Sequence, residues 1–362
     1  VTGVQTCALP IWGVPVTQQC QSPGRNLKEL LATPSPKRPF QIAAAFEEGW
    51  TAKEVADASG VGYWFLGQLY DCFQVSLRLK VFHSLQDVPT RLMREAKMFG
   101  YSDLQISRNI FGAGAAVAME PEVRNARVRM GITPIIKQID TTAGEFPAAS
   151  AYFYMTYGAS GSAESDYSPL NRDSPLAPIL IIGSGVYRIG SSVEFDHSVV
   201  SCSRTIKSVQ PGRRTVVLNH NPETVSTDYD EVDALYFEEI SVERVLDILD
   251  AEGTPNVIVS MGGQTAQNLV PSLEREPKSK VNILGTSPSN IRMAEDRHMH
   301  SQMLDDIGVH QALWTSSAKF SELAAFASKH FPVLVRPSFV LAGAAMKVVR
   351  DRAALDTYVQ EA

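Results

Sequence analysis

Long hydrophobic runs and an excess of positive charge are both missing from this sequence, and each absence narrows what the chain can be. No uninterrupted apolar run approaches the roughly 20 residues that a membrane-spanning helix needs. The 33 Lys and Arg residues are outnumbered by 39 Asp and Glu residues, which gives a net charge of −6. Neither a membrane nor a nucleic acid is therefore predicted as a partner, because nucleic-acid binding requires a concentrated basic surface.

Cysteine is also scarce. The four cysteines, Cys7, Cys20, Cys72 and Cys202, follow neither metal-ligand nor redox-motif spacing. They are interpreted as free thiols of an intracellular, reducing compartment, with the cytoplasm favoured over the mitochondrial matrix.

The first residues do not resemble a targeting segment. Val1–Trp12 has neither a basic start nor a long apolar stretch, so it is not expected to be a signal peptide. It resembles a translated sequencing adaptor. Residues 1–37 are therefore interpreted as a disordered or artefactual leader, and the natural N-terminus is expected upstream.

An internal repeat indicates two helix–turn–helix joints. Residues 46–55 and 97–106 share a glycine, an aromatic residue, a hydroxyl residue and, three positions later, Glu or Gln. The glycine suits the left-handed end of one helix, and the hydroxyl with Glu or Gln forms a capping box for the next. The capping pairs are Thr51 with Glu54, and Ser102 with Gln105. With the helical apolar spacing over 63–80, this predicts a bundle of short helices over 38–111 that serves packing or oligomerisation.

The next segment is predicted to connect this bundle to a second domain. Residues 112–119 are interpreted as a linker, and a short helix is expected from Pro121, at its first position, to Gly131. An extended stretch over 132–140 and the aromatic-rich 146–157 follow. Residues 158–177, rich in Ser, Gly, Asp and Pro, mark a domain boundary.

Strands and helices then alternate. Apolar runs at 179–182, 215–218, 257–260 and 281–284 are separated by helical segments, a pattern typical of a doubly wound parallel sheet. Ligands of such sheets bind beyond the carboxyl ends of the strands. The loops 183–192, 219–227 and 261–264 are therefore expected to converge on one site.

The first of these loops is rich in glycine. Gly183, Gly185 and Gly190 precede a helix that Ser191 opens, and such a turn presents N–H groups to a phosphate or carboxylate. A dinucleotide fingerprint would place its third glycine at position 188 and an acid after the second strand, where Asn219 stands instead. A dehydrogenase is therefore disfavoured, and a tight strand-to-helix turn remains the alternative.

Several long motifs together resemble one known family. They are GSGVYRIGSSVEFD (183–196), NPETVSTDYDE (221–231), LYFEE (235–239), GGQ (262–264), LGTSP (284–288), AEDR (294–297) and VRPSFVLAGAAM (335–346). In this order they resemble the large chain of carbamoyl phosphate synthetase, in its carbamoyl-phosphate-forming half. The helical region is similar to the oligomerisation domain of that family, with KQIDTTAGEFPA (137–148) as the connector.

The resemblance implies a mixed fold. An all-α helical oligomerisation domain with its connector would occupy 38–157, followed by a linker over 158–177. A doubly wound α/β pre-ATP-grasp domain would occupy 178–296, and the first part of an ATP-grasp domain 297–362. In the last part, a strand ending before Arg336, a small-residue loop and a returning strand over 346–350 are expected.

The resemblance also implies an activity and its partners. The complete enzyme would be an ATP-grasp ligase that phosphorylates carbamate with ATP and Mg²⁺ or Mn²⁺. Overall it would use bicarbonate, ammonia or glutamine, and two ATP for arginine or pyrimidine biosynthesis. A glutamine amidotransferase, as small chain or fused domain, and a homo-oligomer through the helical domain would be its partners.

Residue roles follow from the matched motifs. Arg297 and Arg336 would hold ATP phosphates, and Gly343 would belong to a phosphate-covering loop in which Ala342 and Ala344 depart from some relatives. Glu194 and Glu223 would line the path of carbamate. The supporting loop residues would be Gly183, Gly185, Gly190, Ser191, Asn221, Thr224, Gly262, Gly263 and Gln264.

Simpler structural roles remain open for several of these residues. Both glutamates could cap a helix or turn, and Arg297 could pair with a neighbouring acid. Asn221 and Thr224 could order only their own turn. Gly262 and Gly263 could merely allow a strand and a helix to approach.

The metal ligands of the family are expected beyond Ala362. The chain alone is therefore predicted to be an inactive fragment of an active enzyme. A non-catalytic assembly or oligomerisation module with a structural α/β domain is the alternative.

Overall fold

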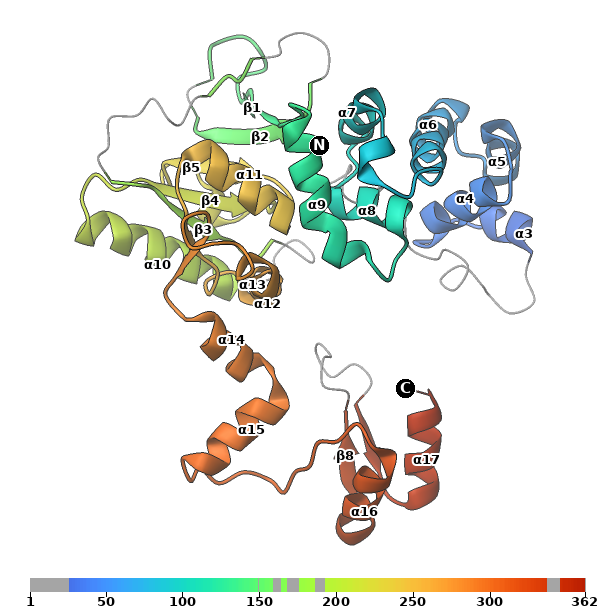
Figure 1. Cartoon of the computed structure of the whole chain (residues 1–362), viewed down its shortest axis with the longest axis vertical. Coiled ribbons are helices and arrows are strands. Elements are labelled where there is room, and N and C mark those ends of the chain that lie inside the picture. The colour runs from blue at the N-terminus through green and yellow to red at the C-terminus, as the bar shows by residue number, and fades with distance from the viewer. Residues whose placement is uncertain are drawn as a thin grey trace. The chain divides into compact units, whose positions relative to one another are not determined.

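The computed structural model describes residues 26–148, 150–158, 164–167, 176–185, 193–336 and 346–361. These residues form two compact units, one ending at Asn282 and the other beginning at Ile283 (Figure 1). Among the described residues, no helix is long and apolar enough to cross a membrane.

The first unit begins with a helical bundle whose core is continuous. Its helices are α3 (Leu27–Ala32), α4 (Arg38–Glu47), α5 (Ala52–Ser59), α6 (Tyr63–Leu79), α7 (Thr90–Met98), α8 (Asp103–Phe111) and α9 (Ala116–Arg129), with the short 3₁₀ helix η2 (Leu85–Asp87) before α7. The bundle starts earlier than the predicted boundary at Arg38. Asn26 caps α3, and the fully buried Leu31 joins the bundle core.

The helix joints of the internal repeat are confirmed. Gly49 and Gly100 have φ angles of 90° and 84°, the left-handed conformation that a glycine adopts without strain. In the first joint the Glu54 amide donates to the Thr51 hydroxyl, and the Thr51 amide donates to the Glu54 carboxylate. The equivalent reciprocal bonds form between Ser102 and Gln105. Local sequence therefore fixes where α5 and α8 begin.

The helix expected to start at Pro121 begins earlier. Helix α9 starts at Ala116, so much of the supposed linker is helical and Pro121 lies inside the helix. Pro121 is the sixth residue of α9, beyond the first amides that lack an intrahelical acceptor, so the helix forgoes one backbone hydrogen bond at this position. The predicted end is correct: the Gly131 amide bonds to the Val128 carbonyl, and its φ is 68°.

A seven-stranded sheet completes this unit, in the order β1-β2-β5-β4-β3-β6-β7. The strands are β1 (Ile135–Gln138), β2 (Tyr152–Thr156), β3 (Ile179–Ile182), β4 (Thr215–Asn219), β5 (Ala234–Phe237), β6 (Asn256–Ile258) and β7 (Asn282–Leu284). Strands β3 and β4 are buried along their whole length, as expected of central parallel strands.

The extended stretch expected over 132–140 contains β1, but its place at the outer edge of the sheet was not expected from the sequence. Strand β2, from the supposed connector, pairs in parallel with β5, and β1 pairs with β2 antiparallel. Strand β5 is itself an additional strand, which overlaps the start of the LYFEE motif. The predicted parallel sheet is therefore correct for its centre and incomplete at this edge.

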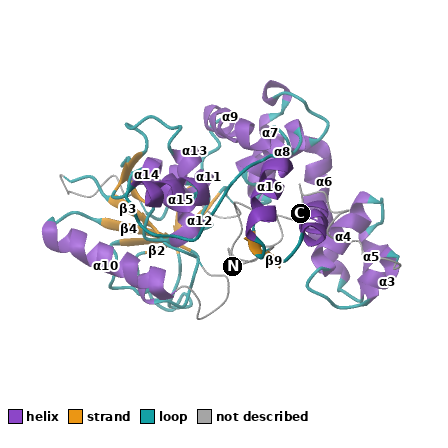
Figure 2. Ribbon diagram, turned by 90° about the horizontal axis from the view of Figure 1, so that it is seen from below, coloured by secondary structure: helices purple, strands orange, loops and turns teal. Residues whose placement is uncertain are grey.

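Helices cover both faces of the sheet. Helix α10 (Val193–Val209) connects β3 to β4, and α11 (Val242–Glu252) connects β5 back to β6. Because the chain reverses direction along the sheet, right-handed crossovers place these helices on opposite faces, as Figure 2 shows. The shorter α12 (Gly263–Gln267) and α13 (Val270–Leu273) follow β6. The reversal leaves β3 and β6 adjacent, so the loops after them meet where ligands bind in doubly wound sheets.

Charged side chains join the bundle to the sheet. The Lys97 ammonium of α7 lies 3.0 Å from Asp103 Oδ1 and 2.6 Å from Glu243 Oε1 of α11. Arg127 of α9 contacts Asp103 at 2.8 Å and Asp247 of α11 at 2.9 Å. Lys97 and Arg127 are only 3% and 0% exposed, so these ions are removed from water and compensated by one another. We call the buried residues Lys97, Asp103, Arg124, Arg127, Tyr157, Glu243 and Asp247, together with the half-buried Arg244, the interface cluster.

The second unit contains helices on either side of a small hairpin. Its elements are α14 (Pro288–Glu295), α15 (Arg297–Asp306), α16 (Phe320–His330), β8 (Val333–Val335), β9 (Lys347–Val349) and α17 (Arg352–Glu361). Strands β8 and β9 pair antiparallel, which confirms the expected returning strand. Ala324, Ala327, Val349 and Leu355 form the buried centre of a core between α16, β9 and α17.

Candidate functional site

The loops that follow β3 and β6 are in contact. A Cβ atom on Gly262 would lie 2.5 Å from the carbonyl oxygen of Ile182, and closer still to that of Gly183. Since both obstacles are backbone atoms, only a residue without a side chain allows the loops to approach in this way. The expected meeting of these two loops is confirmed for their described residues.

The loop after β4 joins the same edge. A Cβ atom on Gly183 would lie 2.8 Å from Asn219 Nδ2, and one on Gly185 would lie 2.7 Å from His220 Nε2. Gly185 also has a φ of 66°, which favours glycine independently of the crowding. The carboxyl ends of β4, β3 and β6 therefore form one continuous edge, built from close contacts between backbone and polar side chains.

Gly263 allows α12 to approach α10 closely. Its φ is 64°, and an added Cβ atom would lie 2.8 Å from the ring of Phe195 in α10. The residue opens α12, and Gln264 follows within that helix, half-buried. The simpler interpretation, that Gly262 and Gly263 permit a close approach of elements, is thus what the geometry shows directly.

Hydrogen bonds within the loop after β4 hold its shape. The Asn221 amide donates to Asn219 Oδ1 at 3.1 Å, and the Glu223 amide donates to Asn221 Oδ1 at 3.1 Å. Thr224 precedes the 3₁₀ helix η4 (Val225–Thr227), and its carbonyl accepts from the Thr227 amide. Asn221 therefore orders its own turn, as the alternative interpretation held.

Asp196 is a residue that the sequence reasoning did not single out. Its carboxylate, buried in the first turn of α10, accepts from the Ser226 amide at 3.0 Å and so ties α10 to the loop after β4. An acidic residue at a helix start ordinarily indicates interaction with the helix dipole. Its partner, 30 residues later, could not be read from that position.

The two glutamates predicted to line the carbamate path are exposed. Glu194 lies in the first turn of α10, and Glu223 lies in the turn that Asn221 orders. The carboxylates of Glu194, at the start of α10, and of Glu223, in the loop after β4, therefore both lie near the carboxyl edge of the sheet. Gly190 and Ser191, between β3 and α10, lie outside the described residues.

The predicted phosphate-binding arginines belong to the second unit. Arg297 is the first residue of α15, which Asp296 caps by accepting from the Met299 amide at 2.8 Å. Arg336 follows β8 directly and is exposed. Gly343, on the predicted phosphate-covering loop, lies outside the described residues.

Several pKa values are strongly shifted in the interface cluster. Burial opposes ionisation of Glu243, but Lys97, Arg244 and Arg127 together hold its pKa well below the usual range. Burial and the charge of Glu243 raise the pKa of Asp103. A neighbouring acid, Glu120, has a pKa raised to about 7 by burial and by the charges of Glu243 and Asp103. These shifts arise from packing between the bundle and α11.

Comparison with protein families assigns both halves of the first unit. The family model described as the carbamoyl phosphate synthase preATP-grasp domain matches residues 176–293. The model described as the carbamoyl-phosphate synthetase large chain, oligomerisation domain, matches residues 12–131. The second match includes α3 and residues before it, a region that the sequence interpretation had set apart as a leader.

Curated relatives match most of the chain. It is 44% identical over 334 residues to the multifunctional protein URA2 of Saccharomyces cerevisiae, covering 92% of this chain and 14% of that protein. It is 42% identical over 342 residues to the mitochondrial arginine-specific carbamoyl phosphate synthase large chain of Schizosaccharomyces pombe, covering 94% and 28%. With the multifunctional protein CAD of Squalus acanthias the identity is 39% over 352 residues, covering 96% and 15%.

The chain thus spans less than a third of the length of these relatives. Its two matched domains account for the helical bundle and for most of the sheet. The chain belongs to the carbamoyl phosphate synthetase large-chain family.

Proposed function

We propose that the complete protein phosphorylates carbamate with ATP to give carbamoyl phosphate, as an ATP-grasp ligase. Overall it would consume bicarbonate, ammonia or glutamine, and two ATP, in arginine or pyrimidine biosynthesis. The observation that carries this proposal is the pair of family matches, to an oligomerisation domain and a preATP-grasp domain. The names of the relatives support both pathways, since one is arginine-specific and others are multifunctional proteins.

Within this reaction Arg297 and Arg336 are proposed to hold the phosphates, together with the loop that contains Gly343. ATP supplies the phosphoryl group. A guanidinium group suits a phosphate because it keeps its charge and donates two parallel hydrogen bonds. Arg336 leaves an ordered strand with its side chain exposed, which is compatible with this role.

The edge formed by the loops after β3, β4 and β6 is proposed to guide carbamate. Glu194 and Glu223 could accept hydrogen bonds from a protonated carbamic acid, and enclosure would protect that acid from water. Their exposed carboxylates at the carboxyl edge of the sheet are accessible to a ligand, which supports contact with carbamic acid; the enclosure is itself part of the proposal. The close packing of Gly183 and Gly262 would keep the loops in register.

The proposed Mg²⁺ or Mn²⁺ cofactor is not assigned to residues of this chain. Across the described ranges, no group of three or more His, Cys, Asp or Glu side chains could hold a metal ion. We also propose that this 362-residue chain, which covers a small part of its relatives, does not turn over by itself.

The proposed partners are a glutamine amidotransferase, as small chain or fused domain, and further copies of this chain. The multifunctional relatives support a fused arrangement. Association through the helical region is supported by the oligomerisation-domain match and by three consecutive exposed aromatic residues at the start of α6, of which Trp64 is 68% exposed.

Alanine substitution in the full-length enzyme tests the catalytic proposal. Arg297→Ala and Arg336→Ala should each lower carbamoyl phosphate formation by about a hundredfold or more, because charge stabilisation of a transferring group is lost. Arg352→Ala, which removes a surface arginine paired with Asp356 on α17, should leave activity unchanged.

Circular dichroism should show that each of these variants is folded. Full activity in both test variants would favour the alternative, a non-catalytic assembly module. For the isolated chain, sustained Mg²⁺-dependent ADP release with carbamate and ATP would contradict the proposed lack of turnover.

A further inference from the structure

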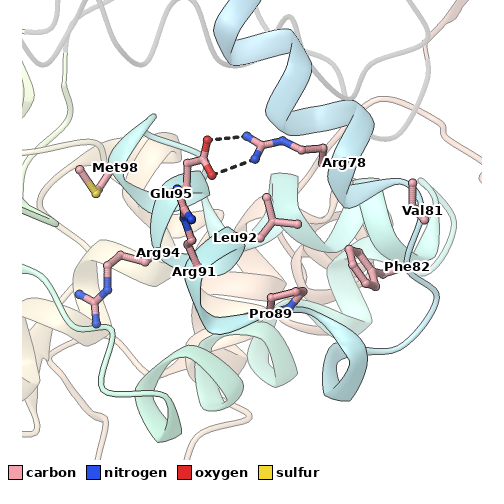
Figure 3. A pocket seen from close by; sticks show the side chains of 9 residues that line it. All are labelled: Arg78, Val81, Phe82, Pro89, Arg91, Leu92, Arg94, Glu95 and Met98. Carbon is pink, nitrogen blue, oxygen red and sulfur yellow. Dashed lines mark hydrogen bonds and ion pairs between the residues drawn. The ribbon is translucent and has the colours of Figure 1, made fainter.

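A groove of about 830 Å³ lies on the helical bundle, between the end of α6, the segment after it, and α7 (Figure 3). Its apolar lining comprises Val81, Phe82, Pro89, Leu92 and Met98, and its charged lining comprises Arg78, Arg91, Arg94 and Glu95. None of these residues belongs to the loops of the candidate site. The groove therefore needs an explanation separate from the proposed reaction.

The charge of the groove is opposite to that of the chain. Three guanidinium groups and one carboxylate line it, whereas the whole chain carries a net charge of −6. The Glu95 carboxylate is bound by Arg78, with hydrogen bonds of 2.9 and 2.5 Å. Arg91 and Arg94 are exposed and, within the described part of the chain, neither has an acidic partner within 4.0 Å. Two exposed guanidinium groups that form no ion pair with the described residues thus border the groove, and Arg91 lies close enough to Glu95 to lower the pKa of that carboxyl.

Apolar side chains lie beside these charges. Val81 is 72% exposed and Met98 is 50% exposed, while Leu92 between them is buried. Figure 3 shows Val81 and Phe82 at one end of the groove and Arg94 and Met98 at the other. Arginine and methionine are enriched in protein interfaces, and the flexible methionine side chain adapts to the shape of its partner.

We propose that this groove binds an acidic, amphipathic helical segment of a protein partner. Arg91 and Arg94 are three residues apart on α7 and therefore project from neighbouring positions on one face. Carboxylates one turn apart on the bound helix would meet them, and its apolar side chains would pack against Val81, Leu92 and Met98. The combination of charge complementarity with an apolar floor selects this occupant over a small anion, which would gain nothing from the floor.

A fluorescently labelled peptide tests the proposal on the intact chain. The probe is an amphipathic helix with glutamates on one face and leucines on the other, and the matched probe has glutamine in place of every glutamate. Anisotropy should show binding of the glutamate probe and at least about tenfold weaker binding of the glutamine probe. Binding should weaken as salt concentration rises.

Substitutions locate the binding site. Arg91→Glu and Arg94→Glu should each weaken binding by about tenfold or more, because a paired charge becomes a repulsive one. Arg129→Glu, at an exposed arginine of α9 outside the groove, is the matched control and should bind as the unmodified chain does. The methyl resonance of Met98 should shift on addition of the glutamate probe, which reports contact with the floor.

Four outcomes would overturn the proposal. They are equal binding of the two probes, equal weakening by Arg91→Glu and Arg129→Glu, an unchanged Met98 resonance, and complete displacement of the probe by millimolar inorganic phosphate. Because Arg91 and Arg94 are exposed, their variants should fold, and thermal unfolding checks that they do.

Discussion

The interface cluster and the loop edge of the candidate site differ in how their charged side chains are placed. In the interface cluster, side chains of opposite charge from the bundle and α11 surround one another and are buried. At the loop edge, glycines bring backbone segments together, and the carboxylates of Glu194 and Glu223 remain exposed. The first arrangement binds the protein to itself, whereas the second leaves its charged groups accessible to a ligand.

This difference shows that shifted pKa values are a poor guide to the candidate site in this protein. Strongly shifted pKa values often mark active sites, because catalysis needs unusual protonation states. Here clear shifts, at Glu243, Asp103 and Glu120, belong to the packing of α11 against the bundle. Structural ion networks shift pKa values by the same physics as active sites do. Topology and exposure therefore locate the candidate site in this chain better than pKa does.

Removing a cation from the interface cluster should have the largest effect on the stability of the protein. Arg127→Met should lower the free energy of unfolding by about 3–5 kcal/mol, because Asp103 and Asp247 would stay buried with one cationic partner fewer, Lys97 remaining beside Asp103 and Arg124 beside Asp247. Arg129→Met, an exposed position on the same helix, should change it by less than about 0.5 kcal/mol. Urea unfolding followed by far-ultraviolet circular dichroism measures both. Equal midpoints for the two variants would mean that the cluster does not hold the bundle to the sheet.

The loop edge should respond to added volume instead. Gly262→Ala would push a methyl group against the carbonyl oxygens of Ile182 and Gly183, and is expected to destabilise the protein by about 1–3 kcal/mol. Gly67→Ala provides the contrast, since this glycine lies inside α6 with nothing within 4 Å of an added Cβ atom. It should stabilise the protein by up to about 1 kcal/mol. Thermal unfolding measures the pair, and a stabilising effect of both changes would refute the close approach of the loops.

The acid beside the interface cluster, Glu120, should give an effect on stability that depends on pH. Because the pKa of Glu120 is raised to about 7, the folded protein retains a proton that the unfolded chain loses near pH 4.5. Ionisation of Glu120 therefore destabilises the fold progressively from pH 4.5 to about 7, and by a constant amount above that.

Glu120→Gln removes this destabilisation. It should stabilise the protein at pH 8 by on the order of 1–3 kcal/mol, and the gain should disappear near pH 4.5. The matched control is Glu122→Gln, at an exposed position of α9. Urea unfolding at the two pH values measures the stability of both variants. A stabilisation by Glu120→Gln that is independent of pH would contradict the raised pKa of Glu120.

Features encoded within a few residues were predicted well. The capping boxes at Thr51 and Ser102, the long helix α6, and the apolar runs that became β3 and β4 are all present. Each depends on local hydrogen bonding or on burial of a continuous run. The meeting of the loops after β3 and β6 was also predictable, because it follows from the topology of alternating strands and helices.

Features that join distant segments could not be predicted in this way. Lys97 and Glu243 are 146 residues apart, and the acids of α11 have the spacing of an ordinary solvated face. Periodicity cannot distinguish a charged face that meets water from one that meets opposite charges. The edge strand β2 was missed for a similar reason, since its pairing with β5 is set by tertiary structure. The roles of Arg297, Arg336 and Gly343 remain predictions from family resemblance.

The outer strands of the sheet constrain how this region can be synthesised and dissected. Met155 of β2 donates to Glu238, which lies 83 residues later in the chain. The hairpin of β1 and β2 therefore leaves the ribosome well before β5, the strand that β2 pairs with. Until β5 is synthesised, the edge of β2 has no hydrogen-bonding partner from that strand. An expression clone of the sheet that starts in the linker over 158–177 would omit this hairpin and expose the edge of β5. Cutting before Ile135 would keep every hydrogen-bonded neighbour of the sheet on the same polypeptide.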